Sequence, residues 1–240
     1  NLTYKEQLEL QYIKEWCDKV FTKFVEHYFD KEWGWEITTT MPNVTVSLLV
    51  RIPNFTSWNW NFMSRNEHLK MEHLEKYSLM PWNWEHVSAG PNITMDTFLN
   101  NPDHPWSYEG LSRNVNITME VVEQFPDAPW SWMYLSRNAG ISMETIMEHI
   151  DKPWHFAEMS YHPHLSMAIL EKYPHKVWDW SVVSKCPRIT FEFVARYPEH
   201  HWSFMQLSNN PNVTMEWVEY FCKQRRRWDW HSLSGNPALQ

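Results

Sequence analysis

Thirteen histidines are the first residues whose chemistry stands out, because a neutral imidazole is the commonest protein ligand of transition metals. Three pairs lie close together in the sequence: His68 with His73, His162 with His164, and His200 with His201. None of these pairs forms an HExxH motif or a cysteine–histidine set with the ligand spacing of a zinc site. The sequence therefore predicts neither a metal nor a cofactor.

Serine is the second candidate for chemistry, since it recurs about every 24 residues, as in Ser88, Ser112 and Ser136. A catalytic site needs one nucleophile beside one base, and it does not need the same serine in every repeat. The pattern instead predicts a small residue that allows close helix approach or bonds back to a carbonyl in the preceding turn. Cys186 has no evident base, and no GxGxxG, P-loop or GxSxG motif occurs. We therefore expect no enzymatic activity and no small-molecule substrate.

Arginine offers a third kind of chemistry, because its guanidinium binds carboxylates and phosphates through two parallel hydrogen bonds. A cluster of three precedes Trp228, and a basic residue recurs at one position of the repeat. We take these as candidate partner-binding residues: Arg225, Arg226, Arg227, Arg65, Arg113 and Arg137. Lys185 occupies the same repeat position, and acidic residues seven positions further on offset this charge in nearly every repeat.

The elements that must position these residues follow from an even spacing of tryptophan. Successive differences are 25, 24, 24, 24, 24, 24, 24 and 26 residues across Trp33, Trp58, Trp82, Trp106, Trp130, Trp154, Trp178, Trp202 and Trp228. A period of this length is the signature of a tandem-repeat architecture. We count each unit from its tryptophan as position 1. Position 3 is then always aromatic, position 7 is usually serine, and position 9 is often asparagine.

The second half of each unit predicts a short helix. In the Trp106 unit, Thr118 can cap the first turn, and Ile117 with Val122 can form a hydrophobic staple across it. Pro126 then ends the helix. The first half predicts another helix, capped by Asp127 with Pro129 in its first turn, and ended by an asparagine such as Asn138 in the left-handed conformation.

Paired short helices predict an all-α fold, a right-handed α-solenoid of short helix-turn-helix repeats in which the aromatic positions 1 and 3 pack between neighbouring units. A leucine-rich-repeat-like solenoid is the alternative, because 24 residues lies within its period. We assign residues 1–32 to an N-terminal capping helix or degenerate repeat, and 33–240 to eight repeats with a partial ninth.

The composition of the chain limits the classes of partner that it is expected to bind. A net charge of −8 argues against nucleic acid and anionic lipid, and no apolar run approaches the roughly 20 residues of a spanning helix. Cys17, Cys186 and Cys222 do not form a disulfide framework, which favours a reducing, intracellular compartment. Six Asn-x-Thr sequons point toward secretion and glycosylation instead, but four of them share one repeat position, where we expect the threonine to cap a helix.

The run Pro-Trp-Ser-Trp-Met-Tyr-Leu-Ser-Arg-Asn-Ala-Gly-Ile-Ser-Met-Glu, from Pro129 to Glu144, resembles the Trp-rich tandem repeats of proteins from giant (nucleocytoplasmic large) DNA viruses. The resemblance covers roughly residues 33–240 and is weakest in the first two units, where Thr38 and Lys70 depart from the pattern. It implies a viral origin and a place in the virion or the host cytoplasm, with capsid or host proteins as partners. It supplies no activity for named residues.

Together these observations predict a non-enzymatic scaffold for protein interaction or structure. Its working surface would be formed by the variable positions 4, 5, 8 and 11, which differ between units while the apolar positions are maintained. The alternative is a modular nucleic-acid binder that reads one element per repeat, as other helical arrays do.

Overall fold

The computed structural model describes residues 60–239 together with Lys23, His27 and Val46. The predicted cap at 1–32 and the Trp33 unit therefore lie almost wholly outside the described residues. The chain divides into two compact parts, one formed by Asn1–Ile117 with Val121–Pro129 and the other by Thr118–Glu120 with Trp130–Gln240.

Every regular element within 60–239 is a helix, and none of these residues forms a strand. The first helices of the units are α5 (Trp60–Met63), α7 (Trp84–Ser88), α9 (Tyr108–Arg113), α11 (Trp132–Leu135), α13 (Phe156–Met159), α15 (Trp180–Val183), α17 (Phe204–Leu207) and α19 (Trp230–Ser234). The second helices are α6 (Met71–Lys76), α8 (Met95–Asn100), α10 (Met119–Gln124), α12 (Met143–Glu148), α14 (Met167–Lys172), α16 (Phe191–Arg196) and α18 (Met215–Lys223), and a 3₁₀ turn, η3 (Pro237–Leu239), follows α19.

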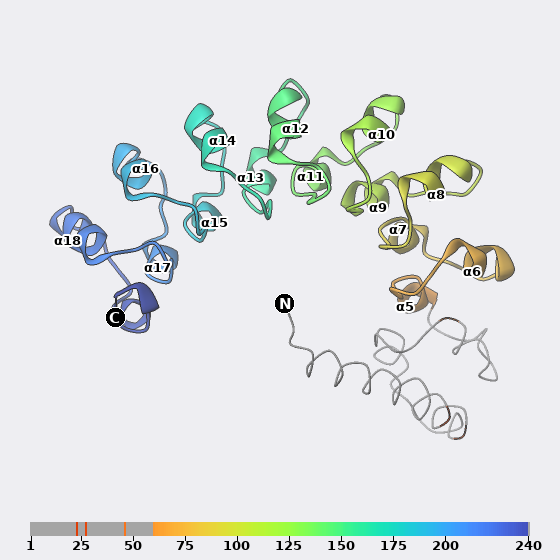
Figure 1. Cartoon of the computed structure of the whole chain (residues 1–240), viewed down its shortest axis with the longest axis horizontal. Helices are drawn as coiled ribbons and strands as arrows, with labels where there is room; N and C mark the ends of the chain where they lie inside the picture. The colour runs from red at the N-terminus through yellow and green to blue at the C-terminus, as the bar shows by residue number, and fades with distance from the viewer. Residues whose placement is uncertain (1–22, 24–26, 28–45, 47–59, 240) are drawn as a thin grey trace, which may run out of the picture. The chain divides into compact units, whose positions relative to one another are not determined.

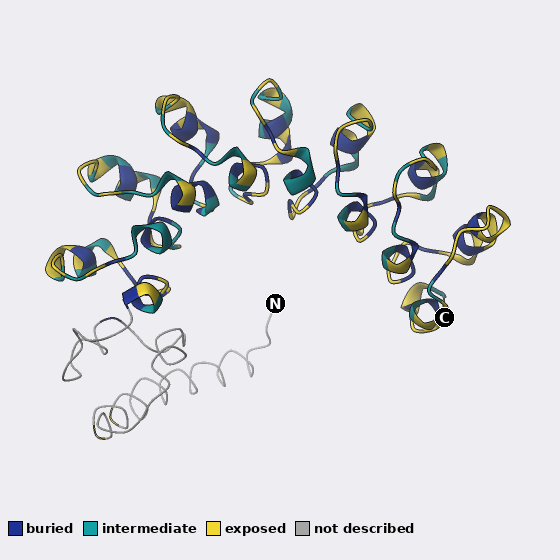
Figure 2. Ribbon diagram, turned by 180° about the vertical axis from the view of Figure 1, so that it is seen from behind, coloured by how far each residue is buried: buried dark blue, intermediate teal, exposed yellow. Residues whose placement is uncertain are grey.

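The helices alternate between two rows within each part, first helices in one and second helices in the other (Figure 1). Most helices are buried on one side and exposed on the other, as the blue and yellow ribbon faces in Figure 2 show. The predicted all-α repeat fold is thus confirmed. The leucine-rich-repeat alternative is wrong, because it requires a strand in every unit. The handedness of the array stays a prediction.

The second helices begin where the sequence predicts. The hydroxyls of Thr94, Ser142 and Thr190 accept the backbone N–H groups of the residues three positions later, which closes the first turn of α8, α12 and α16. Helix α10 ends at Gln124, two residues before Pro126. Helix α18 has nine residues where the other second helices have six, and a two-residue insertion precedes the next tryptophan.

The first helices are shorter than predicted, and they begin later. Helix α11 starts at Trp132 with Ser131 as its N-cap, so the expected cap at Asp127 and first turn at Pro129 are wrong. The cause is visible in the linker of the next unit, where the backbone N–H of Trp154 bonds to the carbonyl of Lys152 at 2.7 Å. Position 1 is therefore fixed in a turn, and the helix begins only at position 3.

The expected left-handed asparagine at position 9 is also wrong. Asn114 has φ −76° and ψ 121°, and Arg225, with φ 60°, is the only non-glycine residue described with positive φ. The turn is closed by a side chain instead. The Asn114 Oδ1 accepts the N–H of Asn116 at 2.9 Å, a local bond that makes a left-handed residue unnecessary.

Aromatic rings fill the boundaries between units, as predicted. The ring at position 3 of one unit meets the tryptophan at position 1 of the next nearly edge to face, a favoured geometry for aromatic pairs. Centroid separations are 4.8–5.2 Å in six such pairs: Trp60–Trp82, Trp84–Trp106, Trp132–Trp154, Phe156–Trp178, Trp180–Trp202 and Phe204–Trp228. These contacts set the spacing of the first helices and thus of the side chains they expose.

Candidate functional site

The repeated serine at position 7 is a buried link between units. The Ser184 hydroxyl donates to the carbonyl of Trp180 at 2.6 Å, and its oxygen accepts the backbone N–H of Ser203 at 3.0 Å. The bond back to the preceding turn was predicted, whereas the bond to the next unit was not. The same acceptor role recurs between Ser64 and Asn83, Ser88 and Ser107, Ser136 and His155, Ser160 and Asp179, and Ser208 and Asp229. These serines are structural, because each accepts an N–H from the next unit, and all but Ser88 also donate to the carbonyl four residues earlier.

The asparagine at position 9 is a second link. The side-chain amide of Asn114 donates to the carbonyls of Ser88, Gly90 and Ile93 in the preceding unit at 2.9–3.0 Å. Asn210 and Asn236 bond in the same way to pairs of carbonyls. Buried amide donors that meet several carbonyls satisfy backbone groups that would otherwise be costly to bury.

Two units replace this asparagine with residues that drew attention as candidates for chemistry. His162 uses Nε2 at 3.0 Å from the carbonyls of Asn138 and Ile141, and its Nδ1 accepts the N–H of His164. Its ring therefore takes the structural place of an asparagine. Burial lowers the pKa of His162, which favours the neutral ring that these bonds require. Cys186 has no amide to offer, and this boundary lacks the equivalent donor.

Position 11 was expected on the variable working surface, but in several units it joins neighbouring repeats instead. Asn92, Asn116 and Asn212 each donate from the side-chain amide to two carbonyls of the unit before. Arg188 bonds to the Leu165 carbonyl from the same position. These three asparagines begin Asn-x-Thr sequons, so their amide groups have structural partners in the unmodified chain.

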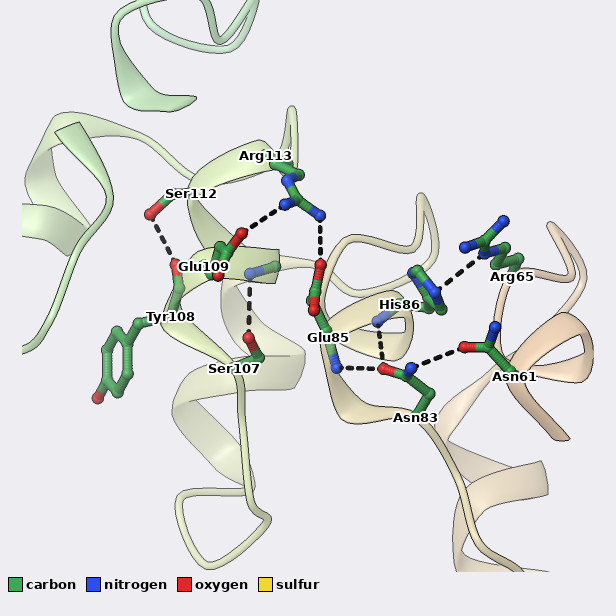
Figure 3. Close-up of polar contacts among 11 residues, drawn as sticks. Asn61, Arg65, Asn83, Glu85, His86, Ser107, Tyr108, Glu109, Ser112 and Arg113 are labelled. Carbon is green, nitrogen blue, oxygen red and sulfur yellow. Dashed lines mark hydrogen bonds and ion pairs between the residues drawn. The ribbon is translucent and has the colours of Figure 1, made fainter. Parts of the chain in front are cut away.

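The exposed side of the first helices in the first part carries a polar network, drawn in Figure 3. Arg113 lies at its centre and forms ion pairs of 2.6 Å with Glu85 of the preceding unit and with Glu109 of its own. Asn83 donates to Asn61 at 2.7 Å, which continues the network to α5. The charge of this predicted binding residue is thus offset by acids at position 4, whereas the sequence had pointed to the acids at position 15.

Arg65 lies on the same side, where its Nε donates to the His86 ring at 3.0 Å. Burial and then the charge of Arg65 lower the pKa of His86, so the neutral imidazole accepts this bond. In the second part, Arg137 pairs with Glu158 of the next unit at 3.2 Å. The structure therefore gives each of the three position 8 arginines a side-chain partner in a neighbouring unit.

The first-helix row of the second part differs in character, because large apolar side chains are exposed on it. Met133 and Met205 at position 4 and Tyr161 at position 8 all extend into solvent. Tyr161 keeps one polar contact, a 3.2 Å bond from its hydroxyl to Asp179. We name this surface the Met-Tyr face: Met133, Tyr161 and Met205. These residues stand at positions 4 and 8 of the predicted working surface, but their types did not single them out, since methionine also fills the core, as at Met63 and Met159.

The three arginines before Trp228 differ in their surroundings. Arg226 donates to the carbonyl of Pro198 at 2.6 Å and lies over the Phe204 ring, with 5.8 Å from its guanidinium carbon to the ring centroid. Arg225 and Arg227 are exposed on either side of it. The two-residue insertion also affects Trp228, whose buried indole N–H has no acceptor. In other units that N–H bonds to the carbonyl five residues earlier, as from Trp202 to Tyr197 at 2.8 Å.

The remaining histidine pairs are not brought together as ligands. His200 is half-buried and stacks on Trp180 with centroids 3.8 Å apart. No group of three or more histidine, cysteine or acidic side chains among the described residues is arranged to hold a metal ion. Nor does that part of the chain contain a helix with the length and hydropathy needed to cross a bilayer.

No protein-family model, curated protein or solved structure matches this chain. The resemblance to Trp-rich viral repeats therefore stays a prediction from the motif.

Proposed function

We propose that this chain is a non-enzymatic repeat scaffold that binds other proteins through the exposed side of its first helices. The observation that supports this most directly is the Met-Tyr face. Its large apolar side chains face solvent, while the apolar residues at positions 1 and 6 of the same units are buried. Flexible methionine and amphipathic tyrosine are suited to protein surfaces, because they supply contact area and adapt to the partner.

Protein is favoured over nucleic acid because the arginines at position 8 of the row already have side-chain partners. Phosphate binding requires several cations that can exchange counterions for phosphate oxygens. Arg113 contacts two carboxylates, Arg137 contacts one, and the net charge of the chain is −8. The alternative, a modular nucleic-acid-binding helical repeat, depends chiefly on the exposed Arg225 and Arg227. Retention of the chain on heparin at low ionic strength would support that alternative.

The motif resemblance suggests where such a scaffold acts. We propose a virion component, or a protein of the host cytoplasm, that joins capsid or host proteins. Mass spectrometry of purified virions tests the first assignment directly. Absence of the chain from virions, together with its presence in infected-cell extract, would favour the second.

Site-specific photo-crosslinking tests the binding face. A benzoylphenylalanine at Met205 is expected to capture a discrete protein partner, and the same group at Glu219, exposed on α18 of the other row, is the control. Unlabelled wild-type chain should compete for capture, whereas a chain with Met133→Ser, Tyr161→Ser and Met205→Ser should not. Equal capture from both positions, or equal competition by both chains, would exclude this face.

A further inference from the structure

A hollow of about 230 Å³ lies between the units that begin with α13 and α15, both within the second part of the chain. A water molecule takes up about 30 Å³ in the liquid, so the hollow has room for a side chain. Cys186 lines it together with Ser160, His162 and Leu165 of the preceding unit. In the boundary at Asn114, the corresponding positions are an asparagine amide and the three carbonyls to which it donates.

The carbonyl groups at this hollow keep hydrogen-bonding capacity that other boundaries use. Cysteine has no amide, and among residues 60–239 no group donates to the Ser160 carbonyl. The His162 carbonyl accepts the N–H of Leu165 and has a second lone pair. Arg188 donates at 3.2 Å to the third carbonyl, that of Leu165. Two acceptors therefore remain for a side-chain amide.

An N–H donor completes this set. Where asparagine occupies position 9, its oxygen accepts the N–H two residues later, as Asn210 does from Asn212 at 3.0 Å. At Cys186 the corresponding N–H belongs to Arg188, and within 60–239 no group accepts it. The hollow thus combines carbonyl acceptors with a backbone donor, and a primary amide has both complementary functions in one group.

The charges around the hollow restrict what can carry that amide. Its charged lining residues are Lys185 and Arg188, both cations and both exposed. Lys185 stands at position 8, where the three arginines have side-chain partners, yet it forms no ion pair with residues 60–239. A cationic ligand would be repelled here, whereas a carboxylate would be attracted. The amide is therefore expected to lie next to an acidic group.

We propose that the hollow receives an asparagine or glutamine side chain of the protein that binds the Met-Tyr face. An acidic residue beside that amide would pair with Lys185 and Arg188. Tyr161 lines the hollow and also belongs to the Met-Tyr face, so one partner segment can contact both. This inference rests on the proposed function for its partner, but the site can be tested without that partner.

The internal boundaries specify the contacts of the inserted amide. Its NH₂ group would donate to the carbonyls of Ser160 and His162, as Asn210 donates to the two equivalent carbonyls at 2.9–3.0 Å. Its oxygen would accept the N–H of Arg188. A carboxylate or a phosphate in the same place has no N–H to give, so either would leave the carbonyls unpaired.

An NMR titration of the ¹⁵N-labelled 240-residue chain with the end-blocked peptide Gly-Glu-Asn-Glu-Gly tests the proposal. We expect saturable shifts centred on residues 160–165 and 182–188. Alanine in place of the peptide asparagine should weaken binding about tenfold, because two hydrogen bonds are lost. Lys185→Ala should weaken binding about threefold, as for one exposed ion pair.

Substitution of the cysteine gives the sharpest comparison. Cys186→Asn places an amide in the hollow from the chain itself, so this variant should lose peptide binding although it stays folded. Cys186→Ala leaves the hollow open, is the matched control and should bind the peptide as the wild type does. Circular dichroism checks that both variants are folded.

Three results would overturn the proposal. Equal binding by Cys186→Asn and Cys186→Ala would place the peptide elsewhere. Equal binding of the asparagine and alanine peptides would show an anion site without recognition of an amide. No saturable shift at millimolar peptide would show that the hollow does not accept this group. Because Met133 and Met205 do not line the hollow, each of these results leaves the crosslinking test of the Met-Tyr face unchanged.

Discussion

The His162 ring lies 3.0 Å from the Ile141 carbonyl, in the place that an asparagine amide occupies in other units. Nδ1 of the same ring accepts a backbone N–H, so Nε2 carries the proton in the neutral form. His162 can replace the asparagine only while its ring is neutral, because Nδ1 must be free of a proton to accept the N–H of His164. This relationship makes one boundary of the array sensitive to pH.

Stability should therefore fall in mild acid. Burial lowers the folded pKa of His162 below its ordinary value of about 6.5. The contribution of neutral His162 to the free energy of unfolding is complete above pH about 6.5. It is lost as the pH falls through the folded pKa, because His162 binds a proton more readily in the unfolded chain than in the folded chain. Urea unfolding between pH 7.5 and 5 measures this loss. His162→Asn should flatten the curve, with the remaining slope due to other buried histidines, whereas a His164→Asn control that flattened it equally would contradict this origin.

Ser184→Ala should destabilise the chain by about 1–3 kcal/mol, because it leaves the buried N–H of Ser203 without an acceptor. Ser181→Ala, an exposed serine on the same helix, is the matched control and should change the free energy of unfolding by less than about 0.5 kcal/mol. Chemical denaturation measures both values. Equal stability of the two variants would show that the link between units contributes nothing.

Cys186→Asn should stabilise the chain by about 1 kcal/mol, since it adds an amide donor facing the carbonyls of Ser160 and His162. The geometry of Asn210, which bonds to Ser184 and Cys186 at 2.9–3.0 Å, is the precedent. Cys186→Ser controls for loss of the thiol and lacks the amide reach. A thermal melting temperature unchanged or lowered by the asparagine would show that this boundary has already adapted to cysteine.

Trp132 and Trp154 should be coupled. Their rings meet nearly edge to face at 5.0 Å, a geometry associated with about 0.5–1.5 kcal/mol beyond burial. Each alanine variant should cost about 3–5 kcal/mol, and the double variant should cost less than their sum. Trp132→Phe should be tolerated at under about 1.5 kcal/mol, as phenylalanine fills the same position elsewhere. Strict additivity in urea unfolding would contradict this coupling.

Removing the two carboxylates that pair with Arg113 should create affinity that the wild-type chain lacks. Glu85→Gln with Glu109→Gln removes two acidic charges beside the guanidinium, and this variant should bind heparin at low ionic strength where the wild type elutes. Glu192→Gln with Glu216→Gln changes the net charge equally on the other row and should elute like the wild type. Equal retention of both double variants would attribute the effect to net charge alone.

The sequence predicted the period, the all-helical fold, the caps of the second helices and the aromatic boundaries, because each depends on residues close together or repeated in register. Thr94 caps its helix through a bond to an N–H three residues away, and such local bonds are readable from sequence. The later start of the first helices was missed. It depends on the turn that fixes position 1, as between Trp154 and Lys152, and on an N–H at position 2 that bonds to a serine 19 residues earlier, as Ser203 does with Ser184.

The candidate site was predicted less well. Arginine types and spacing singled out Arg113 as a candidate binding residue. They did not reveal that Glu85, 28 residues earlier, comes within 2.6 Å of it. Distances across stacked units depend on the geometry of packing, which periodicity alone does not supply. Met205 was not named as a site residue although it stands at position 4 of the predicted working surface, because the repeat pattern says which positions vary and not which side chains at them make contacts.

The serine and asparagine links bond to main-chain N–H and carbonyl groups of the adjoining repeat, and every residue type except proline provides both groups. A whole 24-residue module can therefore be duplicated, deleted or exchanged without compensating substitutions in its neighbours. A change in the length of a module is not compensated in this way. The two extra residues before Trp228 leave its indole N–H without an acceptor. The architecture thus tolerates changes in the number of modules more readily than changes in their length.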